Sequence, residues 1–452
     1  MQFEITKEYI QEIQQLVAEQ NNDALLNLLE EVHYADIAEL IEELDIDIEG
    51  LYLIKLLESD KTSDVIAELD EDTREQILKG LSSKEIADEI GELDTDDAAD
   101  IISELSDKQK KEVISHIEDE EHAKDIVELL RYDEDTAGGL MAKELVKVNE
   151  NWNVLTCVKE MRAQAEEVTR VHSIYVVDNN DILKGRLSLK DLLTTSTRSP
   201  IKDVFIKNVD SVSVNEDVED VARIMQKYDL EAIPVVDELG RLVGRITIDD
   251  IVDVIKEEAE KDYQMAAGLV EDVEADDTIL ELTRARLPWL ILGLFGGLGS
   301  VFIMEGYEEF MANPEYKRLF FFTPLIAAMA GNVGVQSSAI VVQGLANDII
   351  KGSLFSRLLK EVSLSLISGS VLGILVILFG FITGMELKFS FTVAISMLIV
   401  IIVASLIGTF VPIILDKRNI DPAIATGPFI TTSNDIFGIF LFFFIAKIIL
   451  GF

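Results

Sequence analysis

Charged and apolar residues are segregated along this 452-residue chain, and the segregation limits what the chain can fold into. Residues 283–452 contain 10 acidic and 11 basic residues, which leaves 73 of the 83 acids and 28 of the 39 bases in residues 1–282. The mean hydropathy of the whole chain is nevertheless +0.24. A strongly anionic, water-soluble part is therefore joined to a nearly neutral, apolar part, and the chain is too long for one hydrophobic core.

The formal net charge of −44 excludes a nucleic-acid surface built on broad basic patches, because phosphate neutralisation needs Lys and Arg. An acidic face needs cationic partners instead, and metal ions are the leading candidates. The single cysteine, Cys157, excludes an intramolecular disulfide framework and a Cys-rich zinc site. The first residues lack the basic and apolar regions of a signal peptide, so we expect the acidic part to stay in the cytoplasm.

Residues 5–130 repeat apolar side chains at helical spacing inside acidic sequence. Similar short units return, as in ADIAELIEELD at 35 and KEIADEIGELD at 84. This pattern predicts short helices stacked in a superhelical array, with a plain irregular helical bundle as the alternative.

An internal repeat follows, in which SIYVVDNNDILKGRLSLKDLL at 173 aligns without a gap on AIPVVDELGRLVGRITIDDIV at 232. Equivalent residues are 59 apart, as Ile174 and Ile233 or Gly185 and Gly244 show. Each copy reads as an apolar strand, a polar turn, a second strand after the Gly and a helix opened by Asp, with an amphipathic helix upstream. This order is similar to a tandem pair of CBS domains. A charged helix is predicted from Asp249 to about Gly268.

The last part of the chain contains five apolar stretches, each close to the length that a helix needs to cross a membrane. They lie near 289–304, 319–345, 363–384, 390–415 and 428–450. The placement of Lys and Arg between them favours a cytoplasmic N-terminus and an external C-terminus.

One ionisable residue, Asp435, lies well inside an apolar stretch, where a charge is costly and indicates function. Thr431, Asn434, Asp435 and Gly438 recur at helical spacing and form one polar, small-residue face. Carboxylate, hydroxyl and amide oxygens together suit a hard cation. An Asp that caps the helix or reaches the membrane surface is the alternative.

The second apolar stretch is unusually polar at GNVGVQSSAI (331–340), where Asn332 and Gln336 interrupt the apolar pattern. Polar or irregular backbone at membrane depth is tolerated where it is buried in protein or lines a water-filled cavity. Gly293 and Gly297 in the first stretch form a GxxxG pair, which favours helix packing over ligand contact.

The order of an acidic helical domain, a CBS pair, a charged helix and five spans resembles the MgtE family of magnesium channels. DTAGGLM at 135–141, GNVGVQ in the second span and DPAIATGPFITTSND at 421–435 support the resemblance. It implies a multidomain fold with an all-α superhelical N-terminal domain, an α/β tandem CBS pair and an α-helical membrane domain with five transmembrane helices. The boundaries that we expect are 1–134 for the helical domain, 135–199 and 200–259 for the CBS domains, 260–286 for the connecting helix and linker, and 287–452 for the membrane domain.

The resemblance also implies a homodimer in the cell membrane whose pore lies between subunits, closed by cytoplasmic Mg²⁺. Asp435 matches the family's pore aspartate, and the pore-lining candidates are Asn332, Gln336, Thr431 and Asn434. The regulatory Mg²⁺ ligands that the resemblance implies are Asp96, Asp100, Glu219, Asp229, Asp250, Asp253, Glu258 and Asp262.

Four positions depart from the family pattern. Lys261 stands where an acid is often found, and Val335 replaces a polar residue of the second span. CBS domains of the family can bind ATP, and Lys190 and Leu230 depart from the pattern for that nucleotide.

Three functions are compatible with the residues. A Mg²⁺-gated Mg²⁺ channel is favoured over a cation-coupled carrier that exports or exchanges divalent ions, because five spans without an inverted repeat do not fit a carrier. A nucleotide-sensing CBS protein with a membrane anchor would not need five spans. No nucleophile and base occur in a catalytic arrangement, so an enzyme is not expected.

Overall fold

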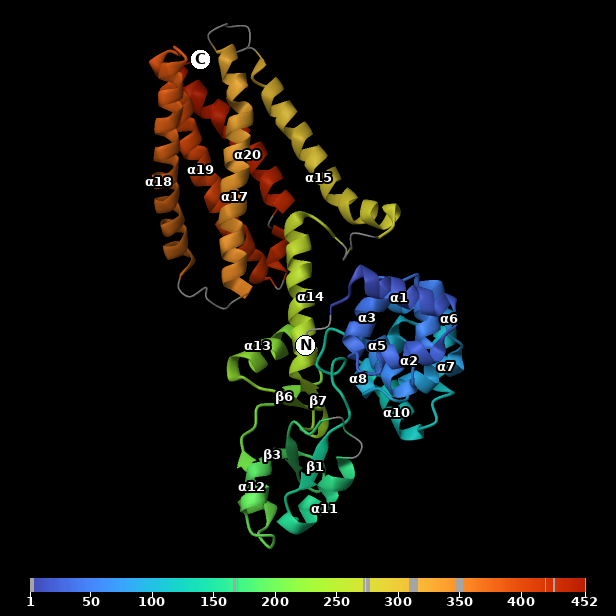
Figure 1. Cartoon of the computed structure of the whole chain (residues 1–452). Helices are drawn as coiled ribbons and strands as arrows, with labels where there is room; N and C mark the ends of the chain where they lie inside the picture. Colours follow the sequence, from blue (N-terminus) through green and yellow to red (C-terminus); the bar gives the residue numbers. More distant parts are fainter. Residues whose placement is uncertain are drawn as a thin grey trace. The chain divides into compact units, whose positions relative to one another are not determined.

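The structure, a computed structural model, divides into two compact units, Met1–Lys256 and Glu257–Phe452 (Figure 1). The described residues are 4–165, 168, 170–270, 273, 277–308, 316–346, 353–418, 420–425 and 427–451.

Short helices make up the first part of the first unit, as the helical spacing of its apolar residues predicts. They are α1 (Lys7–Ala18), α2 (Asn22–Leu29), α3 (Tyr34–Glu42), a π-helical turn η1 (Ile46–Gly50), α4 (Leu51–Ile54), α5 (Ser59–Glu68), α6 (Glu71–Gly80), α7 (Ser83–Ile90), α8 (Thr95–Glu104), α9 (Asp107–Ile114) and α10 (Glu120–Leu129).

Helices two apart along the chain pack on each other in this helical domain. Helix α3 contacts α5, α5 contacts α7, α7 contacts α9, and α8 contacts α10. Each helix buries one apolar stripe, as Ile86 and Ile90 of α7 do. Local caps start the helices: the Ser82 side chain accepts from the Glu85 backbone N–H, and the Glu85 carboxylate accepts from the Ser82 backbone N–H. A regular stack of short helices results.

Two small sheets follow, one in each copy of the repeat. The first has the order β1 (Val146–Asn149), β2 (Ile174–Val177), β3 (Leu183–Leu187) and β4 (Ile206–Lys207), and the second has the order β5 (Val212–Ser213), β6 (Ala232–Val236) and β7 (Leu242–Thr247). In both sheets the first strand is parallel to the second and the second is antiparallel to the third. The helices of this part are α11 (Val154–Gln164), α12 (Leu189–Thr194), a 3₁₀ turn η2 (Ile201–Asp203), α13 (Val218–Tyr228) and α14 (Ile248–Ala267).

The repeat predicts the strands and helices of both copies, with two corrections. The second strand of each copy begins before its glycine, because Gly185 lies within β3 and Gly244 within β7. Ser188, and not an Asp, caps α12, because its hydroxyl accepts from the Lys190 backbone N–H. The predicted charged helix is confirmed as α14.

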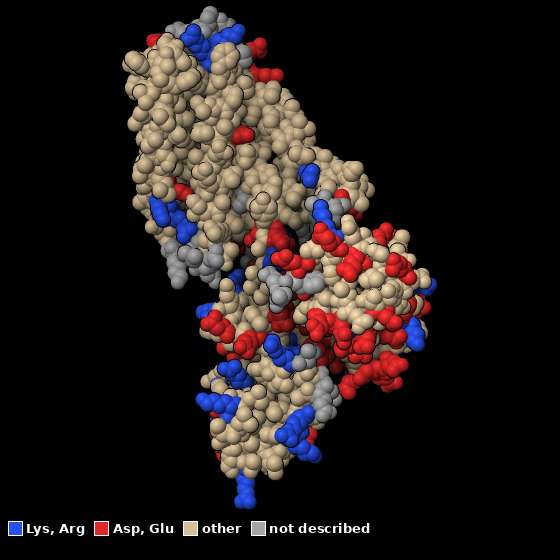
Figure 2. All heavy atoms as spheres, viewed as in Figure 1, with Lys and Arg blue, Asp and Glu red and all other residues tan. Residues whose placement is uncertain are grey.

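The second unit contains five helices that are long and apolar enough to cross a membrane, counted over the residues that the structure describes. They are α15 (Ile279–Glu305), α17 (Thr323–Ala346, preceded by a 3₁₀ turn η3, Lys317–Phe322), α18 (Leu354–Ile382), α19 (Leu387–Asp416) and α20 (Gly427–Leu450, preceded by a 3₁₀ turn η4, Pro422–Ala425). The number of spans is as predicted. On the face shown in Figure 2, acidic side chains gather over the helical domain and few charges lie on the long helices.

Helix α19 is the centre of the membrane unit, because α17, α18 and α20 all pack against it. The backbones of α17 and α19 approach closely, because a Cβ atom at Gly408 would overlap the backbone carbonyl of Gly334. Among the described long helices, α20 is the one with which α15 makes extensive contact.

The structure bears on two expectations for the spans. The polar segment 331–340 does not make the backbone irregular, because α17 is continuous over Thr323–Ala346 and accommodates its polar side chains on the helix. Within the described protomer the GxxxG pair does not contact a neighbouring helix, because a methyl group at Gly293 or Gly297 would meet no described atom within 4 Å. The packed glycine is Gly296, where a methyl group would overlap Thr432 of α20.

Candidate functional site

Acidic side chains from three segments of the first unit converge at the N-terminus of α8. Helix α8 supplies acids of its first turns, α14 supplies acids of its first turn, and the segment that leads into β1 supplies Glu144. We call this group the acidic interface; its members are Asp94, Asp96, Asp97, Asp100, Glu144, Asp249 and Asp250. The predicted ligands Asp96, Asp100 and Asp250 are therefore brought together.

The carboxylates of the acidic interface disfavour one another's charge. Desolvation by the surrounding protein, followed by the neighbouring Asp97 carboxylate, raises the pKa of Asp96 well above its usual value. Desolvation and Asp250 raise the pKa of Asp97 to about 7, and desolvation and Glu134 raise the pKa of Asp100 to about 7. Such shifts mean that these acids would be stabilised by protons or by cations.

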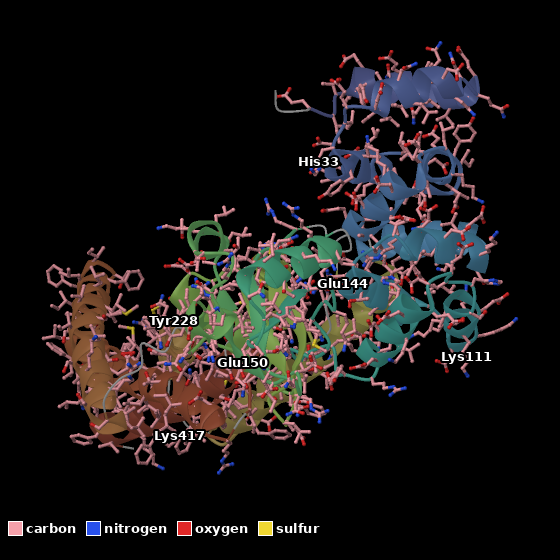
Figure 3. All side chains as sticks on the ribbon, turned by 90° about the horizontal axis from the view of Figure 1, so that it is seen from below. His33, Lys111, Glu144, Glu150, Tyr228 and Lys417 are labelled. Atoms are coloured by element: carbon pink, nitrogen blue, oxygen red, sulfur yellow. The ribbon has the colours of Figure 1, made fainter. Side chains whose placement is uncertain are left out.

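Helix α8 is capped by a residue outside the helical domain. Its N-cap residue, Asp94, makes no side-chain cap hydrogen bond. Instead, Glu144 (labelled in Figure 3) accepts from both the backbone N–H and the hydroxyl of Thr95, at 3.2 and 2.8 Å from its Oε2. The Thr95 hydroxyl oxygen in turn accepts from the Lys143 backbone N–H at 2.9 Å. These bonds join α8 to the segment that enters the CBS pair.

Asp94 uses its carboxylate for a different contact, an ion pair with Arg245 of β7. The distance between Arg245 Nη2 and Asp94 Oδ2 is 3.2 Å. Asp250, at the start of α14, is held by Thr247, whose backbone N–H and hydroxyl donate to Asp250 Oδ2 at 2.8 and 2.7 Å. The second CBS copy therefore contributes both a cation and an oriented anion to the acidic interface.

The acidic interface offers donors that fit Mg²⁺. Carboxylate oxygens of Asp94, Asp96 and Glu144 all lie within 4.8 Å of one another. Hard oxygen donors are the ligands that Mg²⁺ prefers, and it usually keeps several waters when bound by few carboxylates.

The other predicted regulatory acids of the first unit lie apart from this group. Asp253 of α14 faces Glu68 of α5, whose pKa is raised by desolvation and by the Asp253 carboxylate. Glu219 and Asp229 lie at opposite ends of α13 and are exposed. The Glu219 carboxylate is 3.9 Å from Arg223, and Asp229 ends α13 in the left-handed conformation with φ of 50°.

In the second unit, the predicted acids Glu258 and Asp262 lie on the second half of α14. Lys261 donates to Glu258 Oε1 at 3.1 Å. Desolvation and the neighbouring Asp421 carboxylate, which precedes η4, raise the pKa of Asp262. Asp421 was not among the predicted ligands. It lies next to Asp262 although the two residues are far apart in the sequence.

The predicted pore residue Asp435 is half-buried on α20 and faces α17 at Gly331. A methyl group at Gly331 would lie 3.5 Å from Asp435 Oδ1 and 3.2 Å from Thr431 Cγ2. The Thr431 hydroxyl donates to the Gly427 carbonyl at 3.0 Å. Asp435 and Thr431 therefore share one face of α20, as their spacing predicts.

Asn434 occupies a different environment from the one its predicted role suggests. Its side chain is 1% exposed and fills the space beside Gly334, and neither its Nδ2 nor its Oδ1 has a hydrogen-bond partner among the described residues. Asn332 and Gln336 are one helical turn apart on α17 and are exposed. The four pore-lining candidates thus do not surround one cavity of the described protomer.

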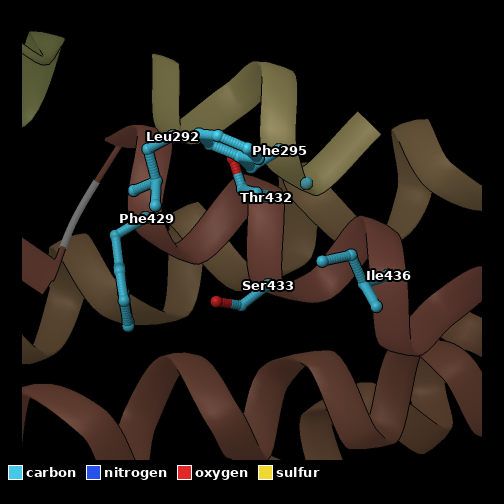
Figure 4. Close-up of a pocket in the computed structure, with 7 residues that line it drawn as sticks. Leu292, Phe295, Phe429, Thr432, Ser433 and Ile436 are labelled. Atoms are coloured by element: carbon cyan, nitrogen blue, oxygen red, sulfur yellow. The ribbon is translucent and has the colours of Figure 1, made fainter. Parts of the chain in front are cut away.

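A cavity of about 270 Å³ lies between α15 and α20 (Figure 4). Its lining is mostly apolar, with the hydroxyls of two α20 residues; the lining residues are Leu292, Phe295, Gly296, Phe429, Thr432, Ser433 and Ile436. None of them is an acid, so this cavity offers a cation no carboxylate.

Sequence reasoning missed Asp94, Asp97, Glu144 and Arg245. Asp94 and Asp97 could have been found as neighbours of Asp96 and Asp100 on α8. Nothing local marks Glu144 or Arg245, because Glu144 is 49 residues from Thr95 and Arg245 is 151 residues from Asp94.

The fold and these acids define a membrane protein of the divalent cation transporter class with a CBS pair. The family model of MgtE, a divalent cation transporter, matches residues 323–445, the model of the MgtE intracellular N domain matches 32–135, and the CBS model matches 137–197 and 201–257. The chain belongs to the MgtE family.

Relatives and solved structures agree with this assignment. Proteins named magnesium transporter MgtE from Enterococcus faecalis and Bacillus subtilis are 38% and 36% identical, each over 72% of this chain and 71% of the relative. The soluble part of a magnesium transporter is similar at 30% identity and a TM-score of 0.50, covering 56% of this chain and 99% of that one. The cytosolic domain of the Mg²⁺ channel MgtE in complex with ATP is similar at 34% identity and a TM-score of 0.51, covering 54% and 99%.

Proposed function

We propose that this protein is a channel that takes up Mg²⁺ across the cytoplasmic membrane and that Mg²⁺ bound to its acidic cytosolic domains closes it. The observation that carries the proposal is the convergence of mutually repelling carboxylates at the acidic interface, in a chain whose relatives are magnesium transporters. The cation-coupled carrier is not favoured by the comparisons.

Repulsion at the acidic interface supplies the energy for gating. Two carboxylates about 6 Å apart repel by about 3 kcal/mol at an effective dielectric constant of about 20. A change of about 5.5 kcal/mol in the free-energy difference between two states shifts their population ratio from 1:99 to 99:1. A few unneutralised pairs therefore suffice to separate the helical domain from the CBS pair at low Mg²⁺, and Mg²⁺ binding reverses this. The ligands that we place in this role are Asp96, Asp100 and Asp250 of the acidic interface, together with Asp253, which faces Glu68 of the helical domain.

The conducting path is proposed to lie between two copies of the chain. Asp435 is the one acid inside the five apolar stretches of the sequence, and a single carboxylate is too few ligands for a hydrated cation. Two copies of Asp435 about a two-fold axis would form a symmetric site. The N-terminus is placed in the cytoplasm and the C-terminus outside, as the distribution of Lys and Arg favours.

The test is Mg²⁺ flux through the full-length protein in liposomes, with the concentration of Mg²⁺ varied on the side of the cytosolic domains. We expect flux to fall as that concentration rises. The variant D96A/D100A/D250A/D253A should lose most of this dependence, whereas the control E8A/E12A/D23A/E31A, which removes four exposed acids of the helical domain, should keep it. Flux that is independent of Mg²⁺ in the unaltered protein would disprove the gating, and absence of Mg²⁺ flux would disprove the channel.

A further inference from the structure

Arg245 is a buried cation whose backbone is held on both sides. It lies in β7, where it pairs with Pro234 of β6, and its backbone N–H and C=O also bond with Ala142 at 2.9 and 2.8 Å. The residue is 5% exposed. Its side chain therefore starts from a fixed point in the second CBS domain and cannot reach bulk water easily.

The guanidinium of Arg245 contacts the helical domain by an ion pair with Asp94. Nη2 lies 3.2 Å from Asp94 Oδ2, and only 6% of the Arg245 side chain is exposed against 27% of the Asp94 side chain. The Nε–H is buried and has no hydrogen-bond partner among the described residues. A buried charge that loses its partner is strongly unfavourable. Arg245 therefore favours the arrangement in which the Asp94 carboxylate contacts its guanidinium.

Asp94 belongs to the acidic interface, so this ion pair places a fixed positive charge among carboxylates that otherwise repel one another. Asp94 is the N-cap residue of α8, directly before the helix that carries Asp96, Asp97 and Asp100. A protein side chain thus provides part of the neutralisation that the proposed function assigns to Mg²⁺. One guanidinium carries half the charge of one divalent ion.

We propose that Arg245 is a positioning residue that acts as a covalently attached counter-cation: it holds the helical domain docked on the CBS pair without metal and reduces the number of divalent ions that docking requires. Docked means that the Asp94–Arg245 and Thr95–Glu144 contacts are made. The inference rests on the proposed function, in which Mg²⁺ stabilises docking.

Replacing Arg245 by Met keeps much of the side-chain length and removes the charge. The metal-free ratio of docked to separated molecules should then fall by about fivefold or more, as a typical coupling between two sites predicts. The dependence of that ratio on Mg²⁺ should become steeper, by about half an ion, because Mg²⁺ must replace the missing charge.

The docked fraction can be measured in the full-length protein by electron spin distance measurements. Spin labels at E112C on α9 and K190C on α12 occupy exposed positions, one on the helical domain and one on the first CBS domain. The native Cys157 is buried and would not interfere. The distance distribution is recorded with a chelator and over a series of Mg²⁺ concentrations.

Three variants serve as controls for R245M. R245K keeps the charge and should keep most of the metal-free docking. R241M removes an exposed arginine one residue before β7 and should behave like the unaltered protein. D94N should lower metal-free docking by itself, but not further in the R245M background, because the two residues act as one pair.

The outcomes separate this inference from the function on which it rests. If the unaltered protein shows no Mg²⁺-dependent docking, the proposed gating is wrong. If it does, and R245M has the same metal-free docked fraction and the same steepness, Arg245 is not a counter-cation. Equal losses in R245M and R245K would show that packing, and not charge, explains the effect. If R245M does not fold, R245Q, which also removes the charge and keeps a polar side chain, decides by the same two measurements.

Discussion

Glu144 caps a helix of a different domain, because its Oε2 accepts from both the backbone N–H and the hydroxyl of Thr95 at the start of α8. The Thr95 backbone N–H, the first of α8, therefore has this acceptor only when the helical domain and the CBS pair are in contact. The Glu144 carboxylate also lies next to His122 of α10, and the distance between His122 Nδ1 and Glu144 Oε1 is 3.9 Å. One side chain thus couples two helices of the helical domain to the segment that enters the first CBS domain.

Replacing Glu144 by Ala should weaken docking of the helical domain. Loss of an N-cap acceptor costs about 1–2 kcal/mol, so the docked fraction at a fixed Mg²⁺ concentration should fall about fivefold to thirtyfold. The spin-label distances described above measure it. The control E118A removes an exposed acid nearby in sequence and should change nothing. Unchanged docking in E144A would show that the cap is not needed.

Docking without metal should be favoured by acid. The pKa of Asp97 and that of Asp100 are raised to about 7, above the ordinary value of 3.8, so the docked form binds protons more tightly than the separated form. The resulting stabilisation is complete below about pH 4 and is lost as the pH rises through about 7. In the presence of a chelator, the docked fraction should therefore be larger at pH 6 than at pH 8.

The same shifts predict that Mg²⁺ and protons compete. Adding Mg²⁺ to weakly buffered protein at pH 6.5 should release protons, which an indicator dye would report. D97N/D100N should reduce both the proton release and the pH dependence. A docked fraction that rises from pH 6 to pH 8 would contradict the sign worked out here.

The pore assignment predicts that D435A abolishes Mg²⁺ uptake in cells that lack other Mg²⁺ transport. D435N should also be severely impaired, because the amide keeps the shape and loses the charge that holds a cation. D416N is the matched control, since Asp416 is an exposed acid at the end of α19. Normal uptake by both Asp435 variants, with normal insertion in the membrane, would exclude Asp435 as the pore ligand.

Two adjacent glycines of α15 should respond differently to a methyl group. At Gly296 it would overlap Thr432, and overpacking of this kind costs about 1–3 kcal/mol, so G296A should lower the melting temperature in detergent. At Gly297 it would meet no described atom within 4 Å, so G297A should be neutral. Equal melting temperatures would mean that α15 does not pack on α20 as described.

Local sequence pattern was sufficient for most of the fold. The 59-residue offset that pairs Ile174 with Ile233 predicts corresponding strands in both sheets, because each copy folds by contacts near in sequence. The five apolar stretches predict the five long helices, since their length is set by the membrane. Gly293 and Gly297 show the limit: spacing identifies a small-residue face, but only the neighbouring helix decides which glycine it contacts.

The candidate site was predictable only in part. Asp96 and Asp100 stand at helical spacing within a string that resembles a known family, whereas Glu144 and Arg245 act through contacts with residues 49 and 151 positions away. Among 73 acids in residues 1–282, such a partner cannot be told from a solvated one by its sequence neighbours. The buried Asn434 is a related case, because spacing places it on the face of Asp435 while Gly334 of α17 encloses its amide.

The close approach of Gly334 and Gly408 has a mechanical consequence. Because α17 and α19 touch backbone to backbone there, and Asn434 of α20 fills the other side of Gly334, three helices meet at one point that has no room for sliding. Packed helices accommodate shear through small side-chain shifts, which two glycines in direct contact cannot supply. Any opening of this membrane unit should therefore be a rotation about that point, with the largest displacements at the ends of the helices.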